Sequence, residues 1–111
     1  MGVTPEFIQA ELARAKTYAV VYLLAGPRYD DHPAGDALVM AHVTRNFQLK
    51  ADGVLAIVGP TRSDGDVRGL YIFNCDPAQA ARLIEDDPAV AAGMFRFEVQ
   101  SLMAFPGDTL A

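Results

Sequence analysis

The sequence predicts one α+β domain with the order strand, helix, strand, strand, helix, strand. Three observations lead to this fold class. Four segments rich in β-branched, aromatic and aliphatic residues alternate with two amphipathic segments. Turns dense in Gly, Pro and Asp separate them. The 111 residues, 51% of them hydrophobic, are enough for one core but not for two. This order is the ferredoxin-like arrangement, in which a four-stranded antiparallel sheet carries two helices on one face.

An extra helix is predicted ahead of this fold, in residues 1–16. Thr4 is suited to the N-cap, Pro5 to the first helical position, and Glu6 to the first turn. One side of the helix is apolar, and its members are Phe7, Ile8, Leu12 and Ala15.

The first strand is predicted over residues 17–25, and both of its faces are apolar. A loop over residues 26–35 follows, and then a helix from Asp36, as N-cap, to about Ala51. We expect its buried stripe to consist of Val39, Val43 and Phe47, because these residues recur every four positions. Gly53 closes the helix.

The second strand is predicted over residues 54–58, again with two apolar faces, and Gly59-Pro60 ends it. A polar turn over residues 63–66 makes a hairpin to the third strand, residues 67–74.

The second long helix begins with Asp76 as its cap and must end before Pro88. Its buried stripe is expected at Ala80, Leu83 and Ile84. A short turn over residues 88–92 leads to the last strand, residues 94–103, where apolar and polar residues alternate. The domain therefore spans residues 17–105, and residues 106–111 form a loose tail.

The first two strands predict a homodimer. Helices cover only one face of such a sheet, and the other face should be polar if it meets water. Leaving these apolar side chains exposed to water would cost roughly 1.5–3 kcal/mol of folding free energy each. We expect two copies to pair their sheets face to face in a dimeric α+β barrel, with the initial helix as a clasp or lid. The alternative is that the initial helix covers this face within one chain.

Composition excludes several classes of function. The net charge of -5 and the absence of a Lys/Arg cluster argue against nucleic-acid binding. No apolar run approaches the roughly 20 residues that span a membrane, and no signal peptide is evident. Cys75 is the only cysteine, which fits a reducing, cytoplasmic location, and we interpret it as a small apolar filler. No nucleotide, flavin or metal motif occurs, so no cofactor is expected.

His42 and Asp87 are the residues best suited to catalysis. His42 lies at the edge of the predicted buried stripe, where its ring can reach the space between helix and sheet for general acid or base chemistry. A hydrogen-bonded core histidine is the alternative. Asp87 precedes Pro88, so N-capping is its default role.

The loop after the first strand offers weaker candidates. His32 with Asp30 and Asp31 has ligand types for a metal, but adjacent residues rarely converge on one ion. Arg28, with Tyr29, is suited to an anionic or aromatic ligand. Tyr22, on the first strand, is a second candidate for substrate binding.

Several segments together resemble YCII-related proteins. They are Ala41-His42, residues 49–55, Val58-Gly59-Pro60 and, most closely, residues 85–95, whose Asp87-Pro88-Ala89-Val90-Ala91-Ala92-Gly93 is similar to a segment of that family. The resemblance covers residues 17–105 and leaves the first helix unexplained. Ala89 stands where the family often has an aromatic residue, which weighs against an aromatic contact there.

The resemblance implies a ferredoxin-like fold that dimerises into an α+β barrel, with His42 and Asp87 facing each other in an active site. It also implies small cyclic or chlorinated aromatic-derived substrates, as for some members. Two functions follow as hypotheses. One is an enzyme that carries out proton transfer, isomerisation or elimination on a small organic molecule. The other is a non-catalytic homodimer that binds a small ligand or serves in a stress response.

Overall fold

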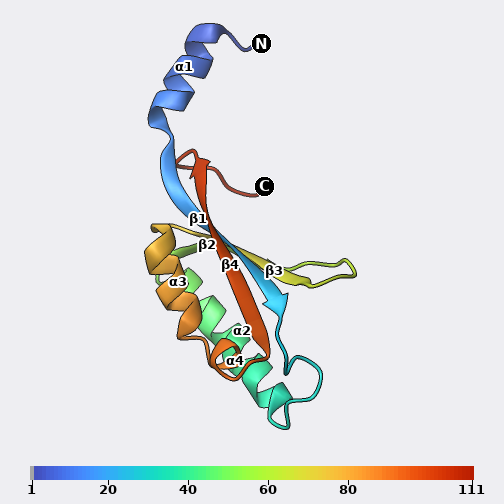
Figure 1. The fold of residues 1–111 in the computed structure, drawn as a ribbon. Helices are drawn as coiled ribbons and strands as arrows, with labels where there is room; N and C mark the ends of the chain where they lie inside the picture. Colours follow the sequence, from blue (N-terminus) through green and yellow to red (C-terminus); the bar gives the residue numbers. More distant parts are fainter. Residues whose placement is uncertain (1) are drawn as a thin grey trace.

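The computed structural model describes residues 2–111, and its helices and strands follow one another in the predicted order (Figure 1). An additional helix precedes the first strand, as expected. The elements are α1 (Pro5–Arg14), β1 (Lys16–Ala25), α2 (Gly35–Ala51), β2 (Leu55–Pro60), β3 (Val67–Phe73), α3 (Pro77–Glu85), α4 (Pro88–Ala91) and β4 (Phe95–Ala104).

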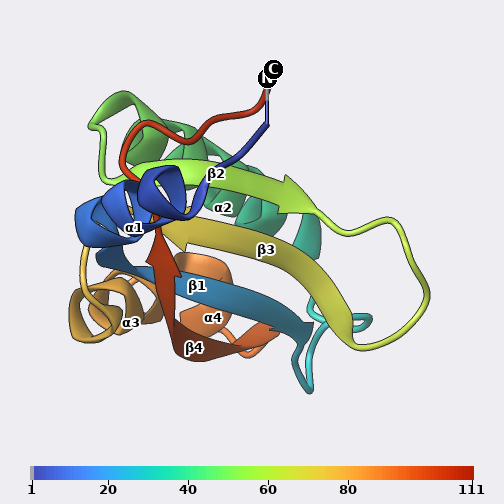
Figure 2. The ribbon, with the colours of Figure 1, turned by 90° about the horizontal axis from the view of Figure 1, so that it is seen from above.

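The four strands form one antiparallel sheet in the order β2-β3-β1-β4. The central strand β1 pairs with β4 from Lys16 opposite Ala104 to Ala25 opposite Phe95. Helices α2, α3 and α4 lie against one face of this sheet (Figures 1 and 2). The structure therefore confirms the predicted ferredoxin-like fold.

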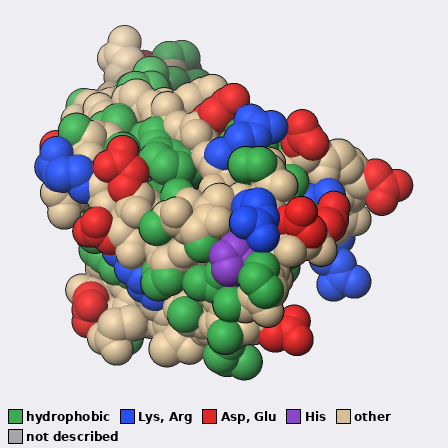
Figure 3. All heavy atoms as spheres, turned by 60° about the horizontal axis from the view of Figure 1, so that its bottom comes forward, with side chains coloured by type: hydrophobic (Ala, Val, Ile, Leu, Met, Phe, Trp, Pro, Cys, Tyr) green, Lys and Arg blue, Asp and Glu red, His purple; other side chains and the backbone are tan. Residues whose placement is uncertain are grey.

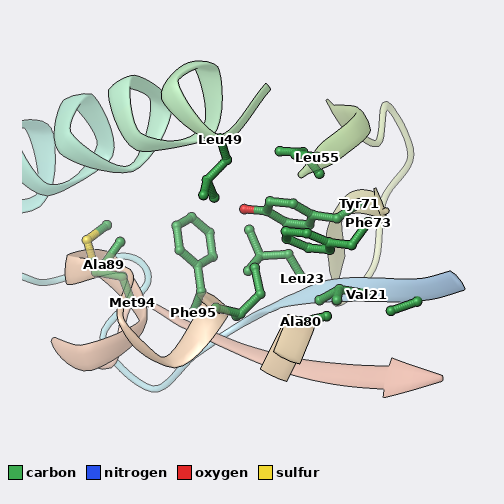
Figure 4. Close-up of a cluster of buried hydrophobic side chains, with 12 residues drawn as sticks. Val21, Leu23, Leu49, Leu55, Tyr71, Phe73, Ala80, Ala89, Met94 and Phe95 are labelled. Carbon is green, nitrogen blue, oxygen red and sulfur yellow. The ribbon is translucent and has the colours of Figure 1, made fainter. Parts of the chain in front are cut away.

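The hydrophobic core lies between the sheet and these three helices. Alternate residues of β1 and β3 face the helices, so Val21 of β1 pairs with Tyr71 of β3 in the same layer (Figure 4). Ile84 of α3 packs on this layer and is fully buried. Each large side chain that is removed from water here contributes roughly 1.5–3 kcal/mol to folding.

Side-chain caps fix the starts of three helices. Thr4 accepts a hydrogen bond from the amide of Phe7 (3.1 Å), and Asp76 accepts one from the amide of Gln79 (2.8 Å). Asp87 caps α4. The predicted cap at Asp36 is wrong: α2 begins at Gly35 after Ala34, without a side-chain cap. Asp36 instead lies in the first turn, where its negative charge interacts favourably with the positive end of the helix dipole.

The predicted buried stripe of α2 is also wrong. Val39, Val43 and Phe47 are 40%, 39% and 63% exposed, whereas the residues of α2 that are buried against the sheet are His42, Asn46 and Leu49. Two polar side chains thus occupy the face where the apolar pattern placed hydrophobic ones. They make the inner face of α2 suited to chemistry, and the apolar stripe is displaced toward solvent.

Gly59 and Pro60 do not end the second strand as predicted, because β2 continues to Pro60. β2 is an edge strand, where the missing N–H of a proline breaks no ladder between two neighbours. The third strand ends one residue earlier than predicted, at Phe73. The side chain of Asn74 instead donates to the carbonyl of Gly53 (3.0 Å).

The face of the sheet away from the helices is apolar along its centre. Val20 and Leu24 of β1 point to this face and are nearly buried, and the half-exposed residues around them are Tyr18, Tyr22, Ile57, Leu70 and Ile72. On β4 the same face carries Arg96, Glu98 and Gln100, which are exposed.

Helix α1 does not cover this face. It projects beyond the N-terminal end of β1 (Figure 1), and none of its residues is buried. Phe7, Ile8 and Leu12 are each about half exposed. The alternative in which α1 shields the sheet within one chain is therefore wrong for this structure. Within residues 2–111, no helix has the length and apolar character that crossing a bilayer requires.

Candidate active site

His42 and Asp87 meet between α2 and α4. His42 Nδ1 lies 2.5 Å from Asp87 Oδ2, although 45 residues separate the two in the chain. The second carboxylate oxygen, Oδ1, accepts a hydrogen bond from the amide of Ala89 (2.8 Å). Asp87 is completely buried and His42 nearly so. The carboxylate therefore has both predicted roles: it caps α4 and orients the imidazole.

The surroundings of Asp87 keep its carboxyl group ionised. Burial alone would raise its pKa, but the hydrogen bond and charge of His42 act in the other direction. The amide of Ala89 and the positive charge of Arg45 add to the effect, and the pKa of Asp87 ends below its ordinary value. Asp87 is thus a buried carboxylate at neutral pH.

An ionised Asp87 decides the orientation of the His42 ring. A carboxylate only accepts hydrogen bonds, so Nδ1 of His42 is assigned as the donor. In the neutral ring, Nε2 then carries the lone pair that can accept a proton. The ring also packs against Phe95, with centroids 5.1 Å apart.

Nε2 of His42 faces two further polar groups. The amide nitrogen of Asn46 lies 3.3 Å away and the hydroxyl of Tyr71 lies 3.4 Å away, and both distances are long for a hydrogen bond. Asn46 Nδ2 donates to the Tyr71 hydroxyl at 3.2 Å. Asn46 Oδ1 is buried without a hydrogen-bond partner among the described residues. Nε2 therefore has only long polar contacts, and the groups that make them also line the pocket between α2 and the sheet.

Tyr71 contributes a neutral phenol. Burial raises the pKa of Tyr71 far above its ordinary value, and the charge of Asp87 adds to this against the opposing hydrogen bond from Asn46. The hydroxyl points from β3 across the core toward α2 (Figure 4). It stays protonated at neutral pH and can donate a hydrogen bond.

These groups line a cleft of about 910 Å³ that opens to solvent. One wall is the apolar stripe of α2, and the opposite wall comes from the loop after β1 and the adjoining ends of β2 and β3. The space-filling view shows hydrophobic side chains gathered on this side of the molecule, with Lys/Arg and Asp/Glu side chains beside them (Figure 3). Such a cleft, apolar with a few polar groups, is typical of a small-molecule site.

A model of the YCII-related domain matches residues 12–102, which is the greater part of the chain. The chain belongs to the YCII-related family. A comparison with curated proteins gives no match. The matched segment begins within α1 and includes both members of the His42–Asp87 pair.

The two substrate-binding candidates of this YCII-related protein do not line the cleft. Arg28 pairs with Asp31 (Nε to Oδ1, 2.9 Å) on the exposed loop. Tyr22 lies on the opposite face of the sheet from His42, beside Leu70 of β3. Tyr29, named with Arg28 for an aromatic ligand, does line the cleft.

The remaining candidates of the YCII-related chain make local contacts, and two of them, Asp30 and His32, also line the cleft. Nδ1 of His32 accepts a hydrogen bond from the amide of Ala34 (3.0 Å). Over residues 2–111, no cluster of three or more His, Cys, Asp or Glu side chains could hold a metal ion. Cys75 packs against the core, and burial, together with the charge of Asp76, raises the pKa of its thiol. A raised pKa disfavours the reactive thiolate and agrees with the filler interpretation.

Sequence reasoning missed Asn46 and Tyr71, although one signal for Asn46 was present. Asn46 follows His42 by four positions, so both side chains share one face of α2. A polar residue at this spacing from a histidine indicates a polar inner face. The sequence shows Tyr71 only as part of an apolar strand, and its role depends on the distant helix that its hydroxyl reaches.

Proposed function

We propose that this YCII-related protein is an enzyme that uses His42 for proton transfer on a small organic molecule bound in the cleft. The observation that carries the proposal is that the two nitrogens of the imidazole have different surroundings. Nδ1 is held by the buried carboxylate of Asp87, while Nε2 faces the groups that line the open cleft. This is the arrangement that a general base requires: one nitrogen oriented, the other available.

The proposed chemistry follows from these groups. Nε2 of His42 takes a proton from a C–H bond of the substrate, and the Asp87 carboxylate stabilises the resulting imidazolium through the Nδ1 hydrogen bond. The Tyr71 phenol donates a hydrogen bond to negative charge that develops on a substrate oxygen. Returning the proton to another carbon completes an isomerisation. If a leaving group departs with its electron pair instead, the reaction is an elimination, and His42 then releases the proton to water.

Deuterium exchange tests this proposal, because it detects the removal of a proton whatever product forms. The protein is incubated in D₂O with a panel of small cyclic ketones, lactones and aromatic-derived acids that carry an acidic C–H bond, and NMR follows the loss of each C–H signal. At least one compound is expected to exchange faster with the protein than in buffer. His42→Ala is expected to slow that exchange by roughly 100-fold or more, the usual contribution of a general base.

Thr44→Ala serves as the matched control, because Thr44 lies on the exposed side of the same helix. It should leave the exchange rate unchanged. Exchange by His42→Ala at the wild-type rate would end the proposal, as would a panel in which no compound exchanges faster than in buffer.

One observation favours the alternative, a non-catalytic protein that binds a small ligand. The His42 side chain is only 10% exposed and its carboxylate partner caps α4, so the contact also ties α2 to α4. A structural role would need no more than this. Compounds that bind in the cleft without any deuterium exchange would select this alternative over catalysis.

We further propose that the protein is a homodimer in which two sheets pack face to face. The support is the apolar centre of the open sheet face, together with the exposed apolar residues of α1, which in this proposal acts as a clasp on the second copy. When two copies pack together, these apolar surfaces are removed from water, whereas in a single chain they stay exposed.

Sedimentation equilibrium is expected to give twice the 11.9 kDa chain mass. Ile72→Glu places a charge at the centre of the apolar face and is expected to yield monomers at concentrations where the wild type is dimeric. Ala78→Glu introduces the same charge on the exposed surface of α3 and should remain dimeric. A wild-type protein that sediments as a monomer at micromolar concentration would contradict the proposal.

A further inference from the structure

Arg68 lines the cleft at an irregularity in the sheet. The β1–β3 ladder slips between Leu23 and Leu24, so that Leu23 pairs with Gly69 and Leu24 pairs with Val67. Arg68 is left over as a bulged residue without a partner in β1. In regular alternation Arg68 would point to the face opposite Gly69. The bulge instead lets both residues line the cleft.

The guanidinium of Arg68 lies over an aromatic ring, and no carboxylate within residues 2–111 pairs with it. Its Cζ is 4.7 Å from the centroid of the Tyr29 ring. Nε is buried and has no hydrogen-bond partner in the described part of the chain. Across residues 2–111 Arg68 forms no ion pair, whereas Arg14, Arg28 and Arg96 each pair with a carboxylate. A half-buried cation with an orphaned donor costs free energy unless a ligand supplies the missing acceptor.

The carboxylates of the cleft do not supply this acceptor. Asp30 and Asp36 also line it, but both are exposed, so water and salt screen them. Arg68 is more sheltered, and its guanidinium contacts the face of the Tyr29 ring, which stabilises it at this position. Such a guanidinium is suited to bind a carboxylate through two parallel hydrogen bonds.

We propose that Arg68 anchors the carboxylate of the substrate, and that the substrate class is a small planar or cyclic carboxylic acid. This rests on the proposed function and names the ligand of the same cleft. Arg68 and Tyr71 are three residues apart on β3, which is about 10 Å along a strand. A carboxylate on Arg68 therefore places a body the size of one substituted ring beside the Tyr71 hydroxyl and His42. Val43, Phe47 and Val58 supply apolar contacts for that body.

Binding of benzoate and benzamide tests the proposal, because the two share shape and differ in charge. NMR titration of the wild-type protein is expected to give benzoate at least ~10-fold tighter binding than benzamide, a difference of about 1.4 kcal/mol. Shifts should centre on the amides of Gly69 and Tyr71. The preference should weaken as salt is raised. Equal affinity for the two compounds, or no binding of either, would overturn the proposal, and this comparison needs no variant.

Variants then locate the anchor. Arg68→Gln is expected to abolish the preference for benzoate, and Arg68→Lys to retain part of it, because lysine keeps the charge but not the fork. Arg82→Gln removes the same charge from the exposed surface of α3 and should bind as the wild type does. A full benzoate preference in Arg68→Gln would contradict the assignment.

His42→Ala separates this inference from the proposed enzyme. Its benzoate preference should survive, since Arg68 does not depend on the imidazole for its position. If the preference persists in the wild type while no compound undergoes deuterium exchange, the anion site stands and the catalytic proposal fails. If exchange is found but benzamide binds as well as benzoate, the catalytic proposal stands and the anion site fails.

Discussion

Replacing Asp87 by alanine is expected to lower the free energy of unfolding by roughly 3–5 kcal/mol. The substitution leaves the nearly buried His42 ring without the acceptor of its Nδ1 proton and removes the cap of α4 at the amide of Ala89. It also empties a site that is completely buried. Urea denaturation followed by circular dichroism measures the change.

Asp86 provides the matched control, because it is the preceding residue in the chain but is exposed. Asp86→Ala is expected to change the unfolding free energy by no more than about 0.5 kcal/mol. Similar losses for the two alanine variants would show that the carboxylate of Asp87 does not hold α2 to α4.

The same carboxylate should make stability depend on pH, and the sign follows from its lowered pKa. A group whose pKa is depressed on folding stabilises the protein above the unfolded value, about 3.9 for an aspartate. That contribution disappears as the pH falls through the lower folded-state value. The gap in unfolding free energy between the wild type and Asp87→Asn is therefore expected to narrow below about pH 4. A gap that stays constant to pH 2 would show that Asp87 is not ionised in the folded chain.

Much of the fold could be predicted from the sequence, because local signals agreed with one another. Thr4-Pro5 and Asp76-Pro77 mark helix starts that the structure confirms, and Gly53 has the positive φ expected of a residue that closes a helix. The alternation of Phe95, Phe97 and Val99 with polar residues identified β4. Each of these signals depends only on neighbours in the chain.

The prediction failed on α2, at the same place where the cleft lies. Periodicity assigns the apolar stripe to the core, and in a helix with only a packing role this rule would have held. Here His42 and Asn46 face the sheet, and Val43 and Phe47 form a wall open to solvent. A helix whose polar residues point inward has its inner face shaped by something other than packing, so the misplaced stripe itself supports a ligand site.

Two other features depend on how distant parts of the chain meet, which local sequence patterns do not record. The bulge that turns Arg68 toward the cleft is set by how β1 and β3 align, which no local pattern records. The contact of His42 with Asp87 joins residues from α2 and the start of α4. It was expected from the family resemblance and not from spacing, since Asp87 by itself is explained as a helix cap.

Gly26→Ala is expected to destabilise the protein by about 3 kcal/mol or more, although it adds a single methyl group. The loop leaves β1 at Gly26, in direct contact with the backbone that leads into β4. A Cβ at this position would lie 2.4 Å from the carbonyl oxygen of Gly93 and 2.9 Å from backbone atoms of Met94 and Phe95. These are backbone atoms that no rotamer change can move. The amide of Gly26 also donates to the carbonyl of Met94 (2.8 Å), so relieving the clash breaks this bond.

Gly59→Ala is the control, since Gly59 is a glycine of β2 at which an added Cβ would meet no atom within 4 Å. Its unfolding free energy should match that of the wild type to about 0.5 kcal/mol, because alanine fits a strand at least as well as glycine. The comparison isolates the close approach of two backbones from the general effect of replacing glycine. If both variants unfold at the same urea concentration, the contact between Gly26 and Gly93 does not position the loop. That loop carries Tyr29, which packs edge-on against Phe95 at 5.6 Å and supports the guanidinium of Arg68. A destabilised Gly26→Ala would therefore show that the wall of the cleft is held by backbone packing, independently of any ligand.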